Sequence, residues 1–181
     1  MKRCSWCNLN NELYVTYHDY EWGVLNLDEE YLYEMLILES FQAGLSWECV
    51  LNKREEFRKA YDFFQIDKVC KYDLKKQEEL KNNPNIIRNS LKIKASVENS
   101  KILKKIQEEF GSFQNYLRKF WDGNIIYEND KTTNYLSDQI SADLKSRGMK
   151  FVGSVIIYSY LQAIGIINSH LDECDLNRSR L

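Results

Sequence analysis

Proline, glycine and long apolar runs are scarce in this chain. Its 181 residues include one proline and seven glycines, which excludes a Pro-rich or Gly-rich linker and leaves no sign of low-complexity segments. No internal repeat indicates a solenoid. No uncharged apolar run reaches the roughly 18 residues that cross a membrane, and Lys2, Arg3 and Cys4 stand where a signal peptide would be apolar. We therefore expect one compact, soluble, cytoplasmic domain over residues 1–181, with no membrane partner and acting as a monomer.

Net charge is also low. The 25 basic and 27 acidic side chains leave a formal charge of −2, which excludes a strong overall attraction to polyanions. The charge is unevenly distributed, because residues 88–105 carry six basic side chains and one acid, Glu98. One face could therefore still contact DNA.

Five cysteines are spread over the whole chain. An odd number without the dense spacing of a small secreted scaffold indicates a reducing compartment, in which metal ligation is favoured over disulfides.

Helical patterns recur along the sequence, and strand signals are weak. Apolar residues follow a period near 3.6, and capping residues stand at the expected ends. The predicted helices are 28–44, 46–61, two short ones opening at Asp67 and Asp73, 91–110, 112–122, one ending at Arg147, and 155–164. Seven or eight helices without a sheet predict an all-α fold.

Both histidines of the chain have a cysteine at a spacing that suits zinc. His170 and Cys174 lie four residues apart, on one face if that segment is helical, and Cys4 lies fourteen residues before His18. Two thiolates and two imidazoles complete a tetrahedral shell and leave no open position, which predicts one structural zinc joining the two ends of the chain. The alternative is that all four are ordinary buried residues. Cys7 is a nearby thiol that could compete with Cys4.

A carboxylate stands in an aromatic region. Glu39 follows Met35, Leu36 and Leu38 on a strongly apolar helix, where burying it requires a donor or a cation. Aromatic residues gather near it in the sequence: Trp6, Tyr14, Tyr17, Trp22 and Trp47. Any one of these rings could simply be core. Together with a buried carboxylate they would form a site for a flat cationic ligand such as an alkylated purine.

The sequence resembles the 3-methyladenine DNA glycosylase I family of the helix-hairpin-helix glycosylase superfamily. The resemblance spans nearly the whole chain. It depends on Arg3-Cys4-x-Trp6, Tyr14-x-x-Tyr17-His18-Asp19-x-Glu21-Trp22-Gly23, Leu38-Glu39-x-Phe41-Gln42-Ala43-Gly44-Leu45-Ser46-Trp47, Lys53-Arg54, Ile86-Ile87-Arg88, Gly148-x-Lys150-Phe151-Val152-Gly153 and Gln162-Ala163.

This resemblance implies a helical glycosylase with a helix-hairpin-helix element and a structural zinc on Cys4, His18, His170 and Cys174. It implies that Trp47 stacks on a flipped base, that Glu39 accepts hydrogen bonds from it, and that the other aromatic residues line the walls. Leu45 would fill the space the base leaves in damaged double-stranded DNA. Because no lysine stands out as a nucleophile, we expect monofunctional hydrolysis that releases 3-methyladenine and leaves an abasic site. Glu39 is the expected catalytic residue.

Contacts to the DNA backbone would come from residues 85–92, a turn before a helix N-terminus, with Arg88, Lys92 and Lys150 as countercharges. Asn85 stands where the family usually has glycine, and asparagine tolerates the left-handed conformation such a turn can need. Two rival functions remain: a non-catalytic, zinc-stabilised DNA-binding module, which needs no carboxylate in a pocket, and a zinc hydrolase, which needs an open metal position.

Overall fold

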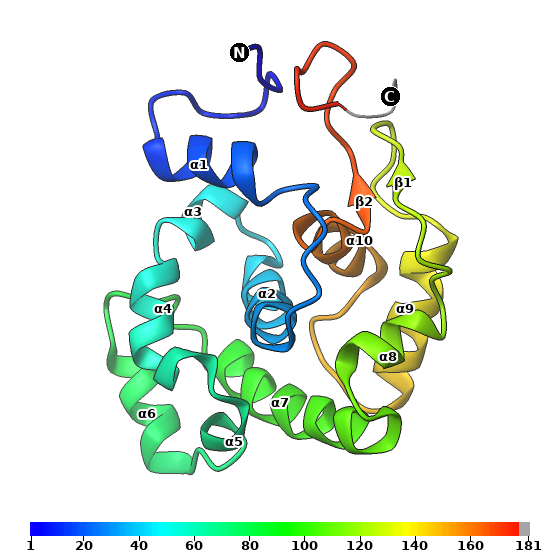
Figure 1. Cartoon of the computed structure of the whole chain (residues 1–181). Helices are drawn as coiled ribbons and strands as arrows, with labels where there is room; N and C mark the ends of the chain where they lie inside the picture. Colours follow the sequence, from blue (N-terminus) through cyan, green and yellow to red (C-terminus); the bar gives the residue numbers. More distant parts are fainter. Residues whose placement is uncertain (178–181) are drawn as a thin grey trace.

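The structure is a computed structural model that describes residues 1–177. Over these residues the chain forms ten α-helices, one short 3-10 helix and two very short strands (Figure 1). The elements are α1 (Glu12–Tyr20), α2 (Glu29–Gln42), α3 (Trp47–Leu51), α4 (Arg54–Ala60), η1 (Asp62–Phe64), α5 (Ile66–Val69), α6 (Leu74–Asn82), α7 (Ser90–Phe110), α8 (Phe113–Arg118), β1 (Ile126–Tyr127), α9 (Tyr135–Ser146), α10 (Ser154–Ala163) and β2 (Ile167–Asn168). The expectation of a helical fold is confirmed.

Several predicted helix starts coincide with capping side chains. The carboxylates of Asp28 and Asp73 and the hydroxyl of Ser112 accept backbone N–H groups in the first turns of α2, α6 and α8. Gly111 ends α7 in a left-handed conformation, as a helix C-terminus favours.

Other predicted boundaries are wrong. The helix expected over 46–61 is two helices, because the chain turns at Asn52 and Lys53 and thereby directs Arg54 into the interior. The helix expected over 112–122 ends at Arg118. The segment 170–174, for which a helix was considered without being predicted, is not helical. Helix α1 and the two strands were not predicted, since α1 buries only Tyr17 and His18 and each strand has two residues.

Helix α2 forms the centre of the core. Its residues from Leu32 to Phe41 are all buried, and α3, α7, α8 and α10 pack around it. Figure 1 shows α2 surrounded by these helices, with the long α7 running beneath it. Since Glu39 belongs to this buried stretch, the fold itself places a carboxylate in the interior.

The segment after α1 is fixed against the end of α10. The N–H of Gly23 donates to the carbonyl of Gln162, and the N–H of Asn26 donates to that of Ile164. The backbones approach so closely that a Cβ on Gly165 would lie 2.1 Å from the carbonyl carbon of Val24. This contact sets the position of Trp22, which directly precedes Gly23, relative to α10.

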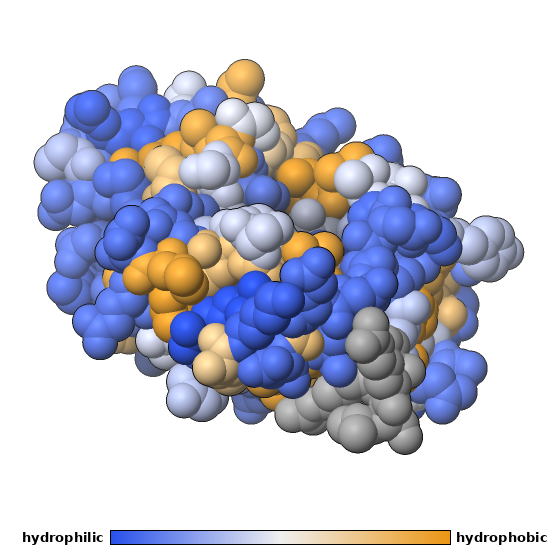
Figure 2. Space-filling model, turned by 90° about the horizontal axis from the view of Figure 1, so that it is seen from above, coloured by the Kyte–Doolittle hydropathy of each residue, from blue (hydrophilic) through white to orange (hydrophobic). Residues whose placement is uncertain are grey.

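The two ends of the described chain lie together. The N–H of Lys2 donates to the carboxylate of Asp175 at 2.7 Å, and the N–H of Asp175 donates to the carbonyl of Lys2 at 2.9 Å. Nearby, β1 and β2 pair in parallel. On the face that carries both ends, apolar patches are separated by hydrophilic side chains (Figure 2). Within residues 1–177 no helix has the length and apolar character that a membrane span requires.

Candidate active site and metal centre

A cavity of about 160 Å³ opens between α2, α10 and the segments that carry the aromatic residues. It is lined by Trp6, Tyr14, Tyr17, Trp22, Glu39, Gln42, Trp47, Ser159 and Gln162. A cavity of roughly 150 Å³ accepts a benzene molecule in other proteins, so this one suits a single flat base. The structure thus brings together all six residues that the sequence assigned to a base pocket.

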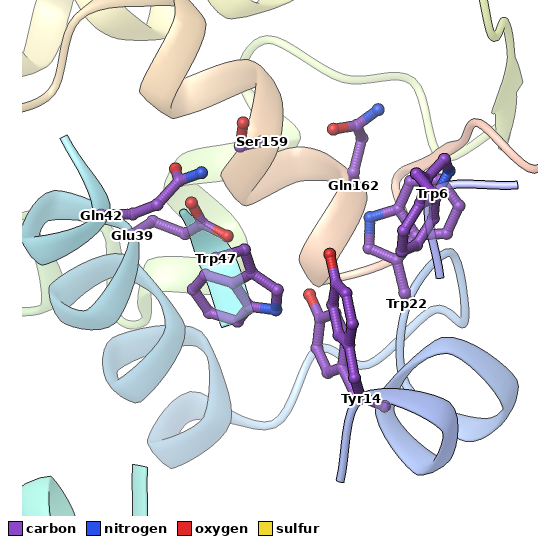
Figure 3. Close-up of a pocket in the computed structure, with 9 residues that line it drawn as sticks. Trp6, Tyr14, Trp22, Glu39, Gln42, Trp47, Ser159 and Gln162 are labelled. Carbon is purple, nitrogen blue, oxygen red and sulfur yellow. The ribbon is translucent and has the colours of Figure 1, made fainter. Parts of the chain in front are cut away.

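Glu39 is the acidic residue of this cavity. Its side chain and the indole of Trp47 border the same space, with Trp6 and Trp22 on the far side (Figure 3). Glu39 is only 3% exposed, and its Oε2 finds no hydrogen-bond partner among the described residues. Burial raises the pKa of this carboxyl well above 4.5, because the charged form loses its hydration. A cationic ligand would supply the missing partner.

The rings form two packed groups around the space. Trp6 meets Trp22 edge to face with centroids 4.6 Å apart and also contacts Tyr14 at 5.7 Å. Tyr17 packs against Trp47 at 5.3 Å, and the indole Nε1 of Trp47 is a second buried polar atom with no partner among residues 1–177. Rings packed this closely are held in place and leave flat faces for a base.

A buried ion-pair network supports one wall. The guanidinium of Arg54 donates to Glu34 of α2 at 2.6 Å and to Glu21 at 2.7 Å. The hydroxyl of Tyr31 also donates to Glu21 and to the carbonyl of Ala163. Because Glu21 precedes Trp22, the network joins α2, α4 and α10 to the segment that bears this tryptophan.

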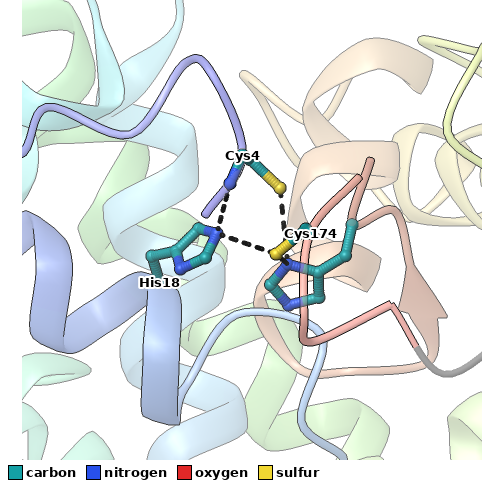
Figure 4. Close-up of side chains that lie close together, drawn as sticks. Cys4, His18 and Cys174 are labelled. Atoms are coloured by element: carbon teal, nitrogen blue, oxygen red, sulfur yellow. Dashed lines mark hydrogen bonds between the residues drawn. The ribbon is translucent and has the colours of Figure 1, made fainter. Parts of the chain in front are cut away.

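Cys4, His18, His170 and Cys174 meet in a second buried site. Their ligand atoms all lie within 4.8 Å of one another. Figure 4 shows Cys4, His18 and Cys174 directed toward a common centre. The sequence-based expectation that these four residues come together is therefore correct.

The spacing of these atoms fits tetrahedral zinc. With Zn–S near 2.3 Å and Zn–N near 2.0–2.1 Å, sulfur and nitrogen ligands lie roughly 3.6 Å apart. The Nδ1 of His170 is 3.5 Å from the sulfur of Cys4 and 3.4 Å from that of Cys174, and the Nε2 of His18 is 3.7 Å from Cys174. Burial raises the pKa of the Cys4 thiol to about 12, so its thiolate requires a nearby cation.

Comparisons with known proteins show which family the chain belongs to. A sequence profile described as methyladenine glycosylase matches residues 6–178. DNA-3-methyladenine glycosylase 1 of Escherichia coli (strain K12) is 38% identical over 181 residues, covering 96% of each chain. The chain belongs to the methyladenine glycosylase family. The crystal structure of a 3-methyladenine DNA glycosylase I has a TM-score of 0.93 at 36% identity, covering 97% of this chain and all of the other. The Staphylococcus aureus enzyme, whose structure concerns 3-methyladenine recognition, has a TM-score of 0.92 at 31% identity, covering 100% of this chain and 99% of its own.

The Cys/His cluster contacts the aromatic cavity directly. The Nε2 of His170 lies 3.2 Å from the carbonyl oxygen of Trp22, and the ring of Trp6 lies edge-on to that of His18 at 5.2 Å. Asp19 accepts from the Nδ1 of His18 at 2.8 Å and from Arg3, which turns the Nε2 of His18 toward the cluster, where the backbone N–H of Cys4 donates to it at 3.3 Å. Two cavity walls therefore depend on the four-residue cluster.

The residues expected at DNA differ in position. Arg88 and Lys150 are exposed, and Leu45 is 41% exposed. Lys92 corrects the prediction: it is 6% exposed, and its ammonium donates to the carbonyls of Phe41 and Ala43, so it does not present its charge to phosphate in this structure. Asn85 is not among the residues with positive φ, so the turn forms without the left-handed conformation considered for it.

Ser159 and Gln162 also line the cavity and were not predicted to do so. Both are polar residues on the apolar helix α10, three positions apart and hence on one face. That spacing was a usable signal.

Proposed function

We propose that this protein is a monofunctional DNA glycosylase that hydrolyses the N-glycosidic bond of 3-methyladenine in alkylated double-stranded DNA. It releases the free base and leaves an abasic site. The observation that carries the proposal is the buried, unpartnered carboxylate of Glu39 beside Trp47 in a cavity the size of one base. The family membership and the relatives named as 3-methyladenine DNA glycosylases support it.

Selectivity follows from charge. Adenine methylated at N3 in DNA is a cation, whereas unmodified adenine is neutral. Burial disfavours the charge of Glu39 and so raises the pKa of its carboxyl. A cationic base between Trp47 and Glu39 restores the carboxylate and gains both ion pairing and stacking. A neutral adenine gains only the stacking.

Cleavage of the N-glycosidic bond requires few catalytic groups beyond those that bind the cationic base. A base that is already cationic departs as a neutral molecule, so no general acid is required. The ionised Glu39 then stabilises the positive charge that develops on the sugar, and water completes the hydrolysis. No lysine lines the cavity in the described part of the chain, which agrees with a mechanism without a Schiff base.

We also propose that one structural zinc ion occupies Cys4, His18, His170 and Cys174. Four buried protein ligands leave no position for a substrate water, so its role is to hold the chain ends and the walls formed by Trp6 and Trp22. This assignment disfavours a zinc hydrolase.

DNA binding is proposed at the turn 83–89 between α6 and α7, used as a helix-hairpin-helix element. The exposed Arg88 and Lys150 would supply positive charge to the phosphates, while the side chain of Asn89 already accepts the N–H groups of Leu91 and Lys92 at the start of α7. Leu45 would fill the space of the flipped nucleotide. We expect the protein to act as a monomer in the cytoplasm.

The test is a glycosylase assay on methylated duplex DNA with chromatographic identification of the released bases. The wild-type protein should release 3-methyladenine and leave alkali-labile abasic sites. Glu39→Gln should reduce release by at least ~100-fold, which matches the size of effect seen for one electrostatic catalytic group. Glu30→Gln on the exposed side of the same helix is the control and should retain wild-type activity. Binding of DNA without release of any base would instead support the non-catalytic module.

A further inference from the structure

Lys92 is the one DNA-contact candidate whose side chain turns inward. Its Nζ donates to the carbonyl of Phe41 at 2.7 Å and to that of Ala43 at 2.5 Å. These carbonyls stand at the C-terminal end of α2, where a helix leaves its last carbonyls without intrahelical partners. A lysine of α7 thus completes the hydrogen bonding of the helix that bears Glu39.

The two carbonyls bracket the turn that leads into the cavity. Gln42, between Phe41 and Ala43, lines the cavity. The turn continues through Gly44, which has a φ of 78°, and closes with a 2.6 Å bond from the N–H of Leu45 to the carbonyl of Gln42. Leu45, at 41% exposed, therefore projects from a turn whose base is held by one ammonium group.

Lys92 is itself held by the hairpin and by a third segment. The side chain of Asn89, at the end of the turn 83–89, accepts the backbone N–H of Lys92 at 3.1 Å. The ring of Phe151 lies 5.9 Å from the Lys92 Nζ. Phe151 has a φ of 56°, which is disfavoured for a bulky side chain. Such a conformation persists only where the surrounding structure holds the residue in place.

The loop bearing Phe151 is also attached to α7. Asn99 donates to the carbonyl of Lys150 at 2.8 Å and accepts its N–H at 2.9 Å. A second lysine contacts the hairpin, since Lys53, which directly precedes α4, donates to the carbonyl of Asn85 at 3.2 Å. Burial lowers the pKa of Lys92, so its charge depends on these carbonyls and the ring.

We propose that Lys92 is a positioning residue that couples the hairpin to the turn bearing Leu45, so that DNA bound at the hairpin meets Leu45 in the place required for base extrusion. This inference rests on the proposed glycosylase function. It gives Lys92 a role through backbone carbonyls instead of through phosphate, and it predicts that the residue matters for extruding a base more than for binding one.

The experiment compares wild-type protein with Lys92→Met, which keeps the length of the side chain and removes its donors. A methylated oligonucleotide is assayed single-stranded and after annealing to its complement, and release of 3-methyladenine is measured on both. Affinity for free 3-methyladenine is measured by tryptophan fluorescence. Lys94→Met, on an exposed position two residues further along α7, controls for loss of one positive charge.

Lys92→Met should lower the ratio of duplex to single-strand rates by at least ~10-fold, equivalent to about 1.4 kcal/mol of activation free energy. Its affinity for the free base should stay within ~2-fold of wild type, because binding of a free base requires no extrusion and Lys92 does not line the cavity. Lys92→Arg, which retains donors, should recover most of the ratio. Lys94→Met should leave the ratio at the wild-type value.

An unchanged ratio in Lys92→Met would overturn the inference, as would an equal loss on both substrates together with loss of free-base binding. A smaller active fraction of a destabilised variant lowers both rates equally, so the ratio remains decisive. If Lys92→Met does not fold, Lys92→Gln, with one neutral donor, is measured in the same way. Absence of release by the wild-type protein on either substrate would refute the proposed function, which is a different outcome.

Discussion

Replacing Glu39 by glutamine should make the protein more stable while it abolishes efficient excision. Glu39 is 3% exposed, its Oε2 has no partner within residues 1–177, and burial alone raises the pKa of its carboxyl. A carboxyl whose pKa is raised on folding stabilises the fold fully below the unfolded pKa near 4.5. That contribution is lost as pH rises through the folded pKa. Glutamine has the same shape and no such dependence.

The magnitude follows from proton linkage. Each unit of pKa shift corresponds to about 1.36 kcal/mol, so the stability difference between Glu39→Gln and wild type grows by up to about 1.4 kcal/mol per pH unit above 4.5. Near pH 4.5 the two proteins should be almost equally stable.

Urea unfolding followed by circular dichroism at about pH 5 and about pH 8 measures this difference in free energy of unfolding. Other titrating groups are common to both proteins and cancel in the difference. Glu30→Gln, exposed on the same helix, should show no pH-dependent gain. The reasoning is refuted if the gain from Glu39→Gln is the same at both pH values, or if the variant is less stable than wild type at the higher one.

Three further predictions concern the metal, the cavity and the ion pairs. Purified protein should contain one zinc per chain by elemental analysis, and Cys174→Ser should lower both the zinc content and the melting temperature; zinc-free, fully stable protein would contradict this. Trp47→Ala should weaken binding of free 3-methyladenine by at least ~10-fold in a fluorescence titration, since base stacking on an aromatic ring is worth about 1–3 kcal/mol. Arg54→Met should lower the free energy of unfolding by about 2 kcal/mol in urea, because Glu21 and Glu34 lose their charged donor while Arg58 still pairs with Glu34.

The Cys/His cluster and the aromatic cavity could be predicted because their residues are chemically unusual at their positions in the sequence. The chain has only two histidines, and each has a cysteine at a suitable spacing. Glu39 is conspicuous within an apolar helix. For such residues, composition and spacing restrict the alternatives strongly, and the fold then brings the predicted partners together.

The inward direction of Lys92 was missed because a run of basic residues suggests a solvated surface. In the structure Lys92 instead lies on a buried face of α7, which it shares with Ser96 and Ser100 at intervals of four. These small polar residues form hydrogen bonds with side chains packed against α7: Ser96 with Tyr61, and Ser100 with Tyr33 of α2. Helical spacing was therefore visible in the sequence, whereas the acceptors of Lys92 come from α2 and its following turn, which no local pattern indicates.

Helix boundaries were least predictable where tertiary contacts decide them. The break at Asn52 and Lys53 serves Arg54, whose partners Glu34 and Glu21 lie far away in the sequence. Helix α1 buries few residues and depends on the cap from Asn11 and on His18, which belongs to the Cys/His cluster. Local periodicity in the sequence does not indicate such long-range contacts, so it cannot predict the helix boundaries that depend on them.

Terminal segments are ordinarily where a domain begins to fray and where exopeptidases gain entry. Here the first ligand, Cys4, and the last, Cys174, belong to one cluster, so neither segment can detach without dismantling a shared centre. With an ion bound, the polypeptide between Cys4 and Cys174 would form a closed ring. Neither terminal segment could then unfold by itself, because both would have to leave the cluster together. The lifetime of the protein against degradation would then follow the supply of metal.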